Sequence, residues 1–284
     1  KRLSLAFAQL LMFSSLSYAE GKCEDGDFWQ TWFEDSQFIG FGNAATKNQI
    51  ANAQLDKADQ FYYGRNLTKD YSKALELYKK AANNGISEAY FKLGLMNHYG
   101  KGKSADFQEA YNFYYKSAIN NDPEAQFNLG LIERYGLGRP KNFSKAFGWF
   151  EKSARQQTSL NKYQCKVIRQ GLLEAQYNLA QMHHYGLGTE KNITYAAMLY
   201  EQAAEQGMKE AQFNIAQILH YGPEELQDFH KAYNWYQKAA SQNLLEAEFN
   251  LGLMHQYGRG TFQDYLLARQ HYLKAVQADI AEAE

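Results

Sequence analysis

Small apolar and aromatic residues recur along this chain with a period of thirty-six residues. An Ala, preceded by Glu in every copy but the first, marks each copy: Ala53, Ala89, Ala125, Ala175, Ala211, Ala247 and Ala283. A Tyr-Gly pair begins ten residues after each of the first six, another Ala follows after twenty-one residues, and an aromatic residue after twenty-five. Four positions kept over six copies indicate a structural unit that is repeated.

Each copy predicts two helices joined by a tight turn. After the marking Ala, a Leu or Ile four residues on and a Met or Ile seven on share one helical face. The Gly after the Tyr can adopt the left-handed conformation with which helices end, and a second Gly two residues later tightens the turn. The second helix opens at Asp, Asn or Ser. Because one helix pair cannot bury its own apolar face and a stack of pairs can, the pattern predicts an all-α fold.

One copy reads AQFNLGLIERYGLGRPKNFSKAFGWFEKSA, residues 125–154, and resembles the Sel-one-like repeat (SLR), a relative of the tetratricopeptide repeat. The resemblance covers residues 51–280. It implies a right-handed α-solenoid whose first helices line a concave groove, and binding of a protein or peptide rather than catalysis. On this interpretation the Tyr and the glycines recur because they build the stack.

The repeats set the domain organisation. We expect a signal peptide at 1–19, an N-terminal arm or cap at 20–50, and the start of a further repeat at 281–284. Six repeats lie between them: 51–86, 87–122, 123–172 with an insert at 157–170, 173–208, 209–244 and 245–280. Lys57 stands where the other repeats carry Leu or Ile, which suits a capping unit with a more polar face. Glu224 replaces the second Gly in repeat five, so this turn should differ.

The first residues have the order of an export signal. Lys1 and Arg2 form a basic head, an apolar run follows, and Ser17-Tyr18-Ala19 supplies the small residues that a signal peptidase accepts. The apolar run is shorter than the about 20 residues that span a membrane. We therefore expect cleavage after Ala19 and no membrane span in the mature chain. The predicted location is the periplasm or the exterior of a bacterium, with the lumen of the endoplasmic reticulum as the alternative.

Charge and motifs argue against several classes of function. The formal net charge of −1, or −3 without Lys1 and Arg2, gives no electrostatic reason to expect nucleic acid as a partner. No GxSxG, HExxH, GxxxxGK or CxxC motif is present. We expect a non-catalytic protein without a cofactor. The alternative is a secreted β-lactamase-like or penicillin-binding SLR enzyme, although such relatives pair cysteines within repeats, and this chain does not have that pattern.

Two sets of polar residues are candidates for contact with a partner on the concave face. The first set lies three residues after the marking Ala: Asn128, Asn178, Asn214 and Asn250. Such amides offer both donors and acceptors. They either grip the backbone of an extended peptide or bond a neighbouring helix and lock the repeats together.

The second set lies nine residues after the marking Ala: His98, Arg134, His184 and His220, with Tyr62 and Gln256 in the outer repeats. Three interpretations are open: an exposed helix face, a rim that contacts a partner, or a metal site formed by His183, His184 and His220. If the histidines contact a partner, protonation near pH 6 should alter affinity.

The remaining candidates concern covalent chemistry. Cys23 and Cys165 are the only thiols. A disulfide between them requires the arm to fold back, and the alternatives are an intermolecular bond or two free thiols. Asn142 and Asn192 lie in N-x-[ST] sequons, as does Asn66, but they also occupy the start of a second helix, where Asn caps well. We favour capping over glycosylation for these two residues.

Overall fold

The computed structural model describes the backbone of residues 47–155 and 170–281, and the side chains of 47–155 and 173–276. Some predictions concern residues outside these ranges. They are the signal peptide at 1–19, the arm before residue 47, the insert except its last residue, the further repeat beyond residue 281, and the pairing of Cys23 with Cys165.

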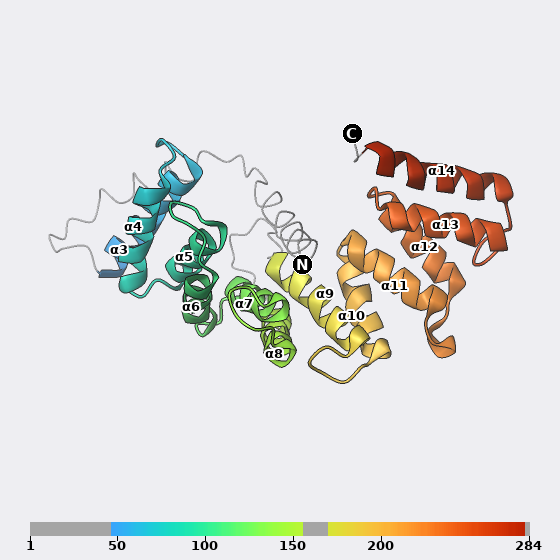
Figure 1. Ribbon diagram of the computed structural model, residues 1–284, viewed down its shortest axis with the longest axis horizontal. Coiled ribbons are helices and arrows are strands. Elements are labelled where there is room, and N and C mark those ends of the chain that lie inside the picture. The colour runs from blue at the N-terminus through green and yellow to red at the C-terminus, as the bar shows by residue number, and fades with distance from the viewer. Residues whose placement is uncertain (1–46, 156–169, 282–284) are drawn as a thin grey trace, which may run out of the picture. The chain divides into compact units, whose positions relative to one another are not determined.

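Every repeat contributes two helices, as predicted. The first helices are α3 (Lys47–Tyr63), α5 (Ser87–Tyr99), α7 (Pro123–Tyr135), α9 (Gln170–Tyr185), α11 (Lys209–Tyr221) and α13 (Leu245–Tyr257). The second helices are α4 (Tyr71–Asn83), α6 (Phe107–Ala118), α8 (Phe143–Arg155), α10 (Ile193–Glu205), α12 (Phe229–Ala240) and α14 (Tyr265–Ala281). All six first helices end at the predicted Tyr. No β-strand occurs in residues 47–155 or 170–281 (Figure 1).

The described residues form two compact units. The first unit comprises residues 47–141, and the second comprises 142–155 together with 171–281. In the first unit, helices α3 to α7 pack in chain order, each against the next. In the second unit, α10 to α14 pack in the same way. Successive helix pairs stacked in this manner confirm the predicted α-solenoid.

The core between the helices consists of small residues facing large aromatic rings. The marking Ala is fully buried from repeat two onward, and so are the rings twenty-five residues later in repeats one to five: Tyr78, Tyr114, Phe150, Tyr200 and Tyr236. Gly94 shows why a small residue is needed opposite such a ring. A Cβ added there would lie 2.5 Å from the ring of Tyr114, closer than carbon atoms can approach.

The turn between the two helices depends on its second glycine. Gly102 has a left-handed φ of 79°, and a Cβ there would lie 3.0 Å from the carbonyl oxygen of Tyr71 in the preceding repeat. A side chain is therefore disfavoured by backbone conformation and by space. Repeat five differs, as predicted: Gly222 has a φ of −74°, and a short 3₁₀ helix, Glu224–Leu226, replaces the glycine turn.

An Asp or Asn side chain caps the second helix in most repeats. Asn142 Oδ1 accepts a hydrogen bond from the Lys145 N–H at 2.9 Å, and Asn192 Oδ1 accepts one from the Tyr195 N–H at 2.9 Å. Each satisfies a backbone donor that the first turn of a helix leaves unpaired. The predicted capping role of both residues is confirmed.

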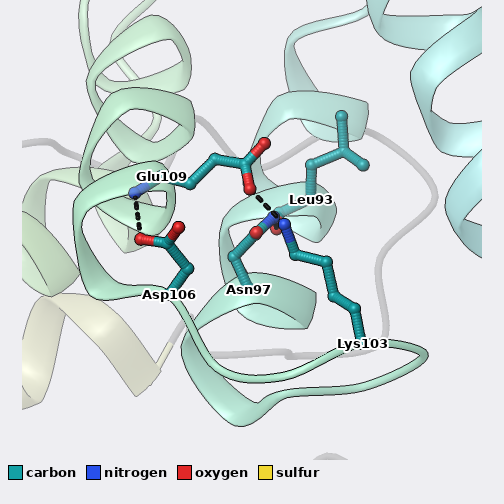
Figure 2. Close-up of polar contacts among 5 residues, drawn as sticks. All are labelled: Leu93, Asn97, Lys103, Asp106 and Glu109. Carbon is teal, nitrogen blue, oxygen red and sulfur yellow. Dashed lines mark hydrogen bonds and ion pairs between the residues drawn. The ribbon is translucent and has the colours of Figure 1, made fainter.

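The turn of repeat two shows how the two helices are joined (Figure 2). Asp106 Oδ1 accepts from the Glu109 N–H at 2.9 Å, and Glu109 forms an ion pair with Lys103 of the turn. The Asp106 N–H in turn donates to the carbonyl oxygen of Asn97 at 2.8 Å. The buried Asn97 side chain donates to the Leu93 carbonyl at 2.7 Å. The end of the first helix and the start of the second are thus tied to each other.

Candidate functional site

One face of each first helix stays accessible after the helices have packed. In repeat five, Glu210, Asn214 and Gln217 are half-buried and Tyr221 is exposed, whereas the intervening Ala211 is fully buried. These four positions follow one another at intervals of four, three and four residues, so they share one side of the helix.

We call the set of these positions in repeats two to six the ladder face. It comprises Glu88, Lys92, Leu95, Tyr99, Glu124, Asn128, Leu131, Tyr135, Glu174, Asn178, Gln181, Tyr185, Glu210, Asn214, Gln217, Tyr221, Glu246, Asn250, Leu253 and Tyr257. Asn178, Asn250 and Leu131 are its buried members, and the others are half-buried or exposed. The predicted asparagine row therefore lies on this face.

The tyrosines that end the first helices are strongly exposed in the second unit. The exposed fractions of Tyr185, Tyr221 and Tyr257 are 60%, 53% and 60%. Tyr99 and Tyr135 of the first unit are half-buried. The interpretation that the tyrosine recurs only to build the stack is therefore incomplete, and sequence reasoning missed its exposure. A regular row of exposed large aromatic side chains is typical of an interaction surface.

In repeats two to five, the residue before the terminal tyrosine lies against its ring. The imidazole of His98 stacks on Tyr99 with centroids 4.8 Å apart, that of His184 on Tyr185 at 4.5 Å, and that of His220 on Tyr221 at 3.9 Å. Their interplanar angles are 29°, 10° and 19°. In the same position, the Arg134 guanidinium carbon lies 5.5 Å from the Tyr135 ring centroid.

The prediction of an exposed helix face at these histidines is wrong for two of them. His98 is 6% exposed and His220 is 3% exposed. Their rings turn toward the second helix and meet the edges of Phe107 and Phe229, with centroids 5.1 and 5.7 Å apart. Buried in this way, the two side chains support the tyrosines and offer a partner almost no surface.

Burial also changes how the histidines titrate. Desolvation lowers the pKa of His98 to about 4. Burial, together with the nearby Arg259, lowers the pKa of His220 to about 4. Burial lowers the pKa of the half-buried His184 as well. His98 and His220 are therefore neutral at pH 6, and the predicted protonation near that pH is wrong for them. Among the side chains that the structure describes, no group of three or more His, Cys, Asp or Glu could hold a metal ion.

The asparagines of the ladder face bond within the protein. Each side-chain Nδ2 donates to the backbone carbonyl four residues earlier, at 2.8 Å for Asn128, 2.9 Å for Asn178 and Asn214, and 2.7 Å for Asn250. Asn214 Nδ2 also donates to Tyr177 Oη of the preceding repeat at 3.0 Å. Asn250 Oδ1 accepts from Tyr221 Oη at 3.2 Å. Asn214 and Asn250 thus join successive repeats.

In each unit, one terminal tyrosine contacts a side chain of the next repeat. In the second unit Tyr221 bonds Asn250 of the next repeat. In the first unit Lys92 takes the place of the asparagine, and its Nζ donates to Tyr63 Oη at 3.4 Å and lies 5.6 Å from that ring centroid. In these two pairs, the terminal tyrosine of one repeat contacts the residue three positions after the marking Ala of the next repeat.

Comparisons with known proteins place these features in a family. The protein-family model described as Sel1 repeat matches residues 53–86, 87–122, 123–157, 173–208, 209–244 and 245–279. No curated protein matches the chain.

Two solved structures are similar to this chain. One is a protective antigen of uropathogenic Escherichia coli strains that displays an SLR fold, with 25% identity and a TM-score of 0.71 over 83% of this chain and 49% of that one. This chain therefore spans about half the length of that antigen. The other is a Sel1 repeat protein from Oxalobacter formigenes, with 27% identity and a TM-score of 0.63 over 80% of this chain and 88% of that one.

Proposed function

Because this chain belongs to the Sel1 repeat family, we propose that it is a non-catalytic scaffold that binds a protein or peptide segment on its ladder face. The observation that carries the proposal is the regular exposure of the tyrosines that end the first helices, with Tyr185, Tyr221 and Tyr257 each more than half exposed. A flat ring with a hydroxyl at its tip supplies both apolar contact and hydrogen bonding to a partner.

The surroundings of the rings support a binding role, because they hold the tyrosines in place before a partner arrives. His220 stacks on one side of Tyr221, and Asn250 accepts a hydrogen bond from the Tyr221 hydroxyl. A side chain that is already ordered loses little conformational entropy on binding. Pre-positioned rings therefore give a larger share of their contact energy to affinity.

In this proposal the asparagines lock neighbouring repeats together, which is the second of the two roles predicted for them. Both hydrogens of the Asn214 amide are engaged within the protein, one by the Glu210 carbonyl and one by Tyr177. A peptide backbone would have to displace these bonds before the amide could grip it. We therefore assign Asn214 and Asn250 to positioning of the ladder face, and contact with the partner to the tyrosines.

Photo-crosslinking tests the proposal. A benzophenone amino acid placed at position 185 should crosslink a defined protein partner, whereas the same amino acid at the exposed Glu201 of α10 should not. The identified partner is then titrated calorimetrically against the wild type and Tyr185→Ala. Equal crosslinking at both positions, or equal affinity for both proteins, would show that the ladder face is not the binding surface.

The enzymatic alternative has a separate test. β-Lactamase-like and penicillin-binding enzymes use a serine three residues before a lysine, and Ser159 and Lys162 have this spacing. Both lie outside the described residues. A non-catalytic scaffold leaves nitrocefin intact, so hydrolysis by the purified chain that is lost in Ser159→Ala would contradict the proposal.

We also propose export, on the basis of the order of residues 1–19. Within the residues that the structure describes, none of the helices has both the length and the apolar character needed to cross a lipid bilayer. N-terminal sequencing of the mature protein should begin at Glu20. Material from the periplasm or the medium that retains the Lys1 segment would contradict this proposal.

A further inference from the structure

The turns that join the two helices of each repeat form a continuous edge of the first unit. They comprise residues 64–70, 100–106 and 136–141. A Cβ added at Gly102 in the second turn would lie 3.0 Å from the carbonyl oxygen of Tyr71, which directly follows the first turn. A Cβ added at Gly138 in the third turn would lie 2.8 Å from the Cβ of Phe107, which directly follows the second turn. We call the surface of these three turns the turn edge.

The turn edge carries an excess of positive charge. It has two acidic residues, Asp70 and Asp106, and its six cationic residues are Arg65, Lys69, Lys101, Lys103, Arg139 and Lys141. The corresponding turns of the second unit, 186–192, 222–228 and 258–264, have two lysines or arginines against five aspartates or glutamates. The positive edge is therefore a feature of the first unit and not of the repeat as such.

Two of the six cations are neutralised within the protein. Lys103 forms an ion pair with Glu109 of α6 (Figure 2), and Arg139 Nη1 lies 3.5 Å from the buried Glu133 Oε1. The other four form no ion pair with any side chain that the structure describes, and they are Arg65, Lys69, Lys101 and Lys141. Their charges are available to a partner.

The two carboxylates of the turn edge are engaged elsewhere. Asp70 Oδ1 accepts from the Lys73 N–H at 3.0 Å, and its Oδ2 lies 3.2 Å from the Lys73 Nζ. Asp106 Oδ1 accepts from the Glu109 N–H at 2.9 Å. Both side chains thus cap the second helix that follows them, and neither forms an ion pair with a cation of the turn edge.

Tyr71 shows that cations of neighbouring repeats converge. The Nζ atoms of Lys69 in the first turn and Lys101 in the second turn lie 5.9 and 5.5 Å from its ring centroid. The ring attracts both ammonium groups, but it is neutral and leaves their positive charge uncompensated. A carboxylate that a partner places beside this ring would be attracted by two cations at once.

The composition of the turn edge favours a protein segment over a bilayer or a nucleic acid. Within residues 99–106 and 135–141, no aromatic, Leu, Ile, Met or Val side chain is exposed, so little apolar surface is present that could enter a lipid layer. The formal net charge of the chain is −1, which does not suit a polyanion as long as a nucleic acid. A short acidic segment needs only the local excess of cations.

We infer that the turn edge of the first unit binds an aspartate- or glutamate-rich segment of a partner protein, with its carboxylates beside Lys69 and Lys101 and toward Arg65 and Lys141. Charge complementarity supports this occupant. The inference goes beyond the proposed function, because none of the turn residues belongs to the ladder face. The acidic turns of the second unit would repel the same segment.

A calorimetric titration of the full chain tests this inference. The probe is a synthetic peptide of alternating glutamate and serine, compared with the same peptide carrying glutamine in place of glutamate. We expect the glutamate peptide to bind at least about tenfold more tightly, because the charge-assisted contacts are lost with the carboxylates. Its affinity should fall as salt rises.

Paired variants separate a defined site from general attraction between charges. Lys69→Gln combined with Lys101→Gln should weaken binding of the glutamate peptide about tenfold, since both cations beside Tyr71 are removed. The matched control, Lys57→Gln with Lys79→Gln, removes two exposed lysines of α3 and α4 and should change affinity by no more than about twofold. Both double variants lose the same charge, and their urea midpoints show that each is folded.

Three results would overturn the inference. They are equal affinity for the glutamate and glutamine peptides, equal losses in the two double variants, and binding of phosphatidylglycerol vesicles by a chain that does not bind the glutamate peptide. The proposed function can fail separately from this inference. A chain that crosslinks no partner at position 185 but binds the glutamate peptide would lose the ladder-face proposal and keep the turn edge as an interaction surface.

Discussion

The two units build the same ladder of tyrosines from the same repeat, but the side chains around the rings differ. In the first unit, residues 47–141 have fourteen lysines and arginines against ten aspartates and glutamates. In the second, residues 142–155 and 171–281 have ten against thirteen. Tyr63 carries Arg65 and Lys92 over its ring and is 40% exposed, whereas Tyr221 bonds a neutral asparagine and is 53% exposed.

This difference shows which parts of the repeat the fold holds constant. The marking Ala, the buried aromatic ring and the turn glycines are constrained by close packing, because little volume is free at these positions. The residue three positions after the marking Ala is Lys92 in repeat two and an asparagine in repeats three to six. One scaffold can therefore present surfaces of different charge from one repeat to the next.

The largest expected effect comes from an aromatic core residue that occupies the same repeat position in each unit. Tyr114 of the first unit and Tyr236 of the second are both fully buried. Tyr114→Ala and Tyr236→Ala should each lower the free energy of unfolding by about 3–5 kcal/mol, through lost burial and a cavity. Urea unfolding measures both. A loss below about 1 kcal/mol in either variant would show that the packing of the two units is not equivalent.

Acid should weaken both units through their buried histidines. The folded pKa of His98 and of His220 is about 4, whereas an unfolded histidine titrates near 6.5. As the pH falls from about 6.5 to 4, the unfolded state binds protons before the folded state does. Each of the two histidines therefore lowers the free energy of unfolding by up to about 1.4 kcal/mol for every pH unit in this range.

The urea midpoint measured between pH 7 and pH 4 checks this prediction. His220→Phe keeps an aromatic ring beneath Tyr221 without a titrating group, so it should make the decline with acid less steep. His98→Phe is the matched variant in the first unit. A wild-type midpoint that is constant over this range would contradict the burial of the two rings.

A smaller effect is expected at the fifth residue after the marking Ala. It is Gly94 in repeat two and Ala216 in repeat five, and each unit contains both glycine and alanine at this position. Gly94→Ala should cost about 1–3 kcal/mol, because its methyl group would meet the Tyr114 ring. Ala216→Gly should cost about 1 kcal/mol through helix propensity and lost contact. A stabilising Gly94→Ala, seen as a higher urea midpoint, would show that the ring moves aside.

The smallest expected effect on stability concerns the residue three positions after the marking Ala. Lys92→Asn gives repeat two the side chain that repeats three to six carry there and should change the free energy of unfolding by no more than about 1 kcal/mol. It removes one cation from beside Tyr63. Urea unfolding measures the change, and a loss above about 2 kcal/mol would show that the contact between Lys92 and Tyr63 stabilises the stack.

Much of the fold could be predicted from the sequence because its signals are local. The Tyr-Gly pairs mark the ends of six helices, Asn142 and Asn192 cap the helices that follow them, and Glu224 marks the altered turn. Each of these features depends on the conformation of a few neighbouring residues. A period kept over six copies then leaves the stacking of pairs as the arrangement that buries every apolar face.

The character of the ladder face could be predicted only in part. Asn178 and Asn250 belong to this face but are buried. His98 and His220 are buried too, whereas the terminal tyrosines of the second unit are exposed. The periodicity of a single helix does not tell which of two adjacent positions at its end turns toward the second helix. That choice depends on Phe107 and Phe229, which receive the histidine rings.

The most direct test of the ladder face is the affinity of the crosslinked partner for a chain that carries Tyr185→Ala, Tyr221→Ala and Tyr257→Ala together. These side chains are more than half exposed, so the thermal midpoint should move by only a few degrees, about the shift that 1 kcal/mol produces. Affinity should fall by at least about a hundredfold, as expected when the central aromatic contacts of an interface are removed. Unchanged affinity in the folded triple variant would contradict the account.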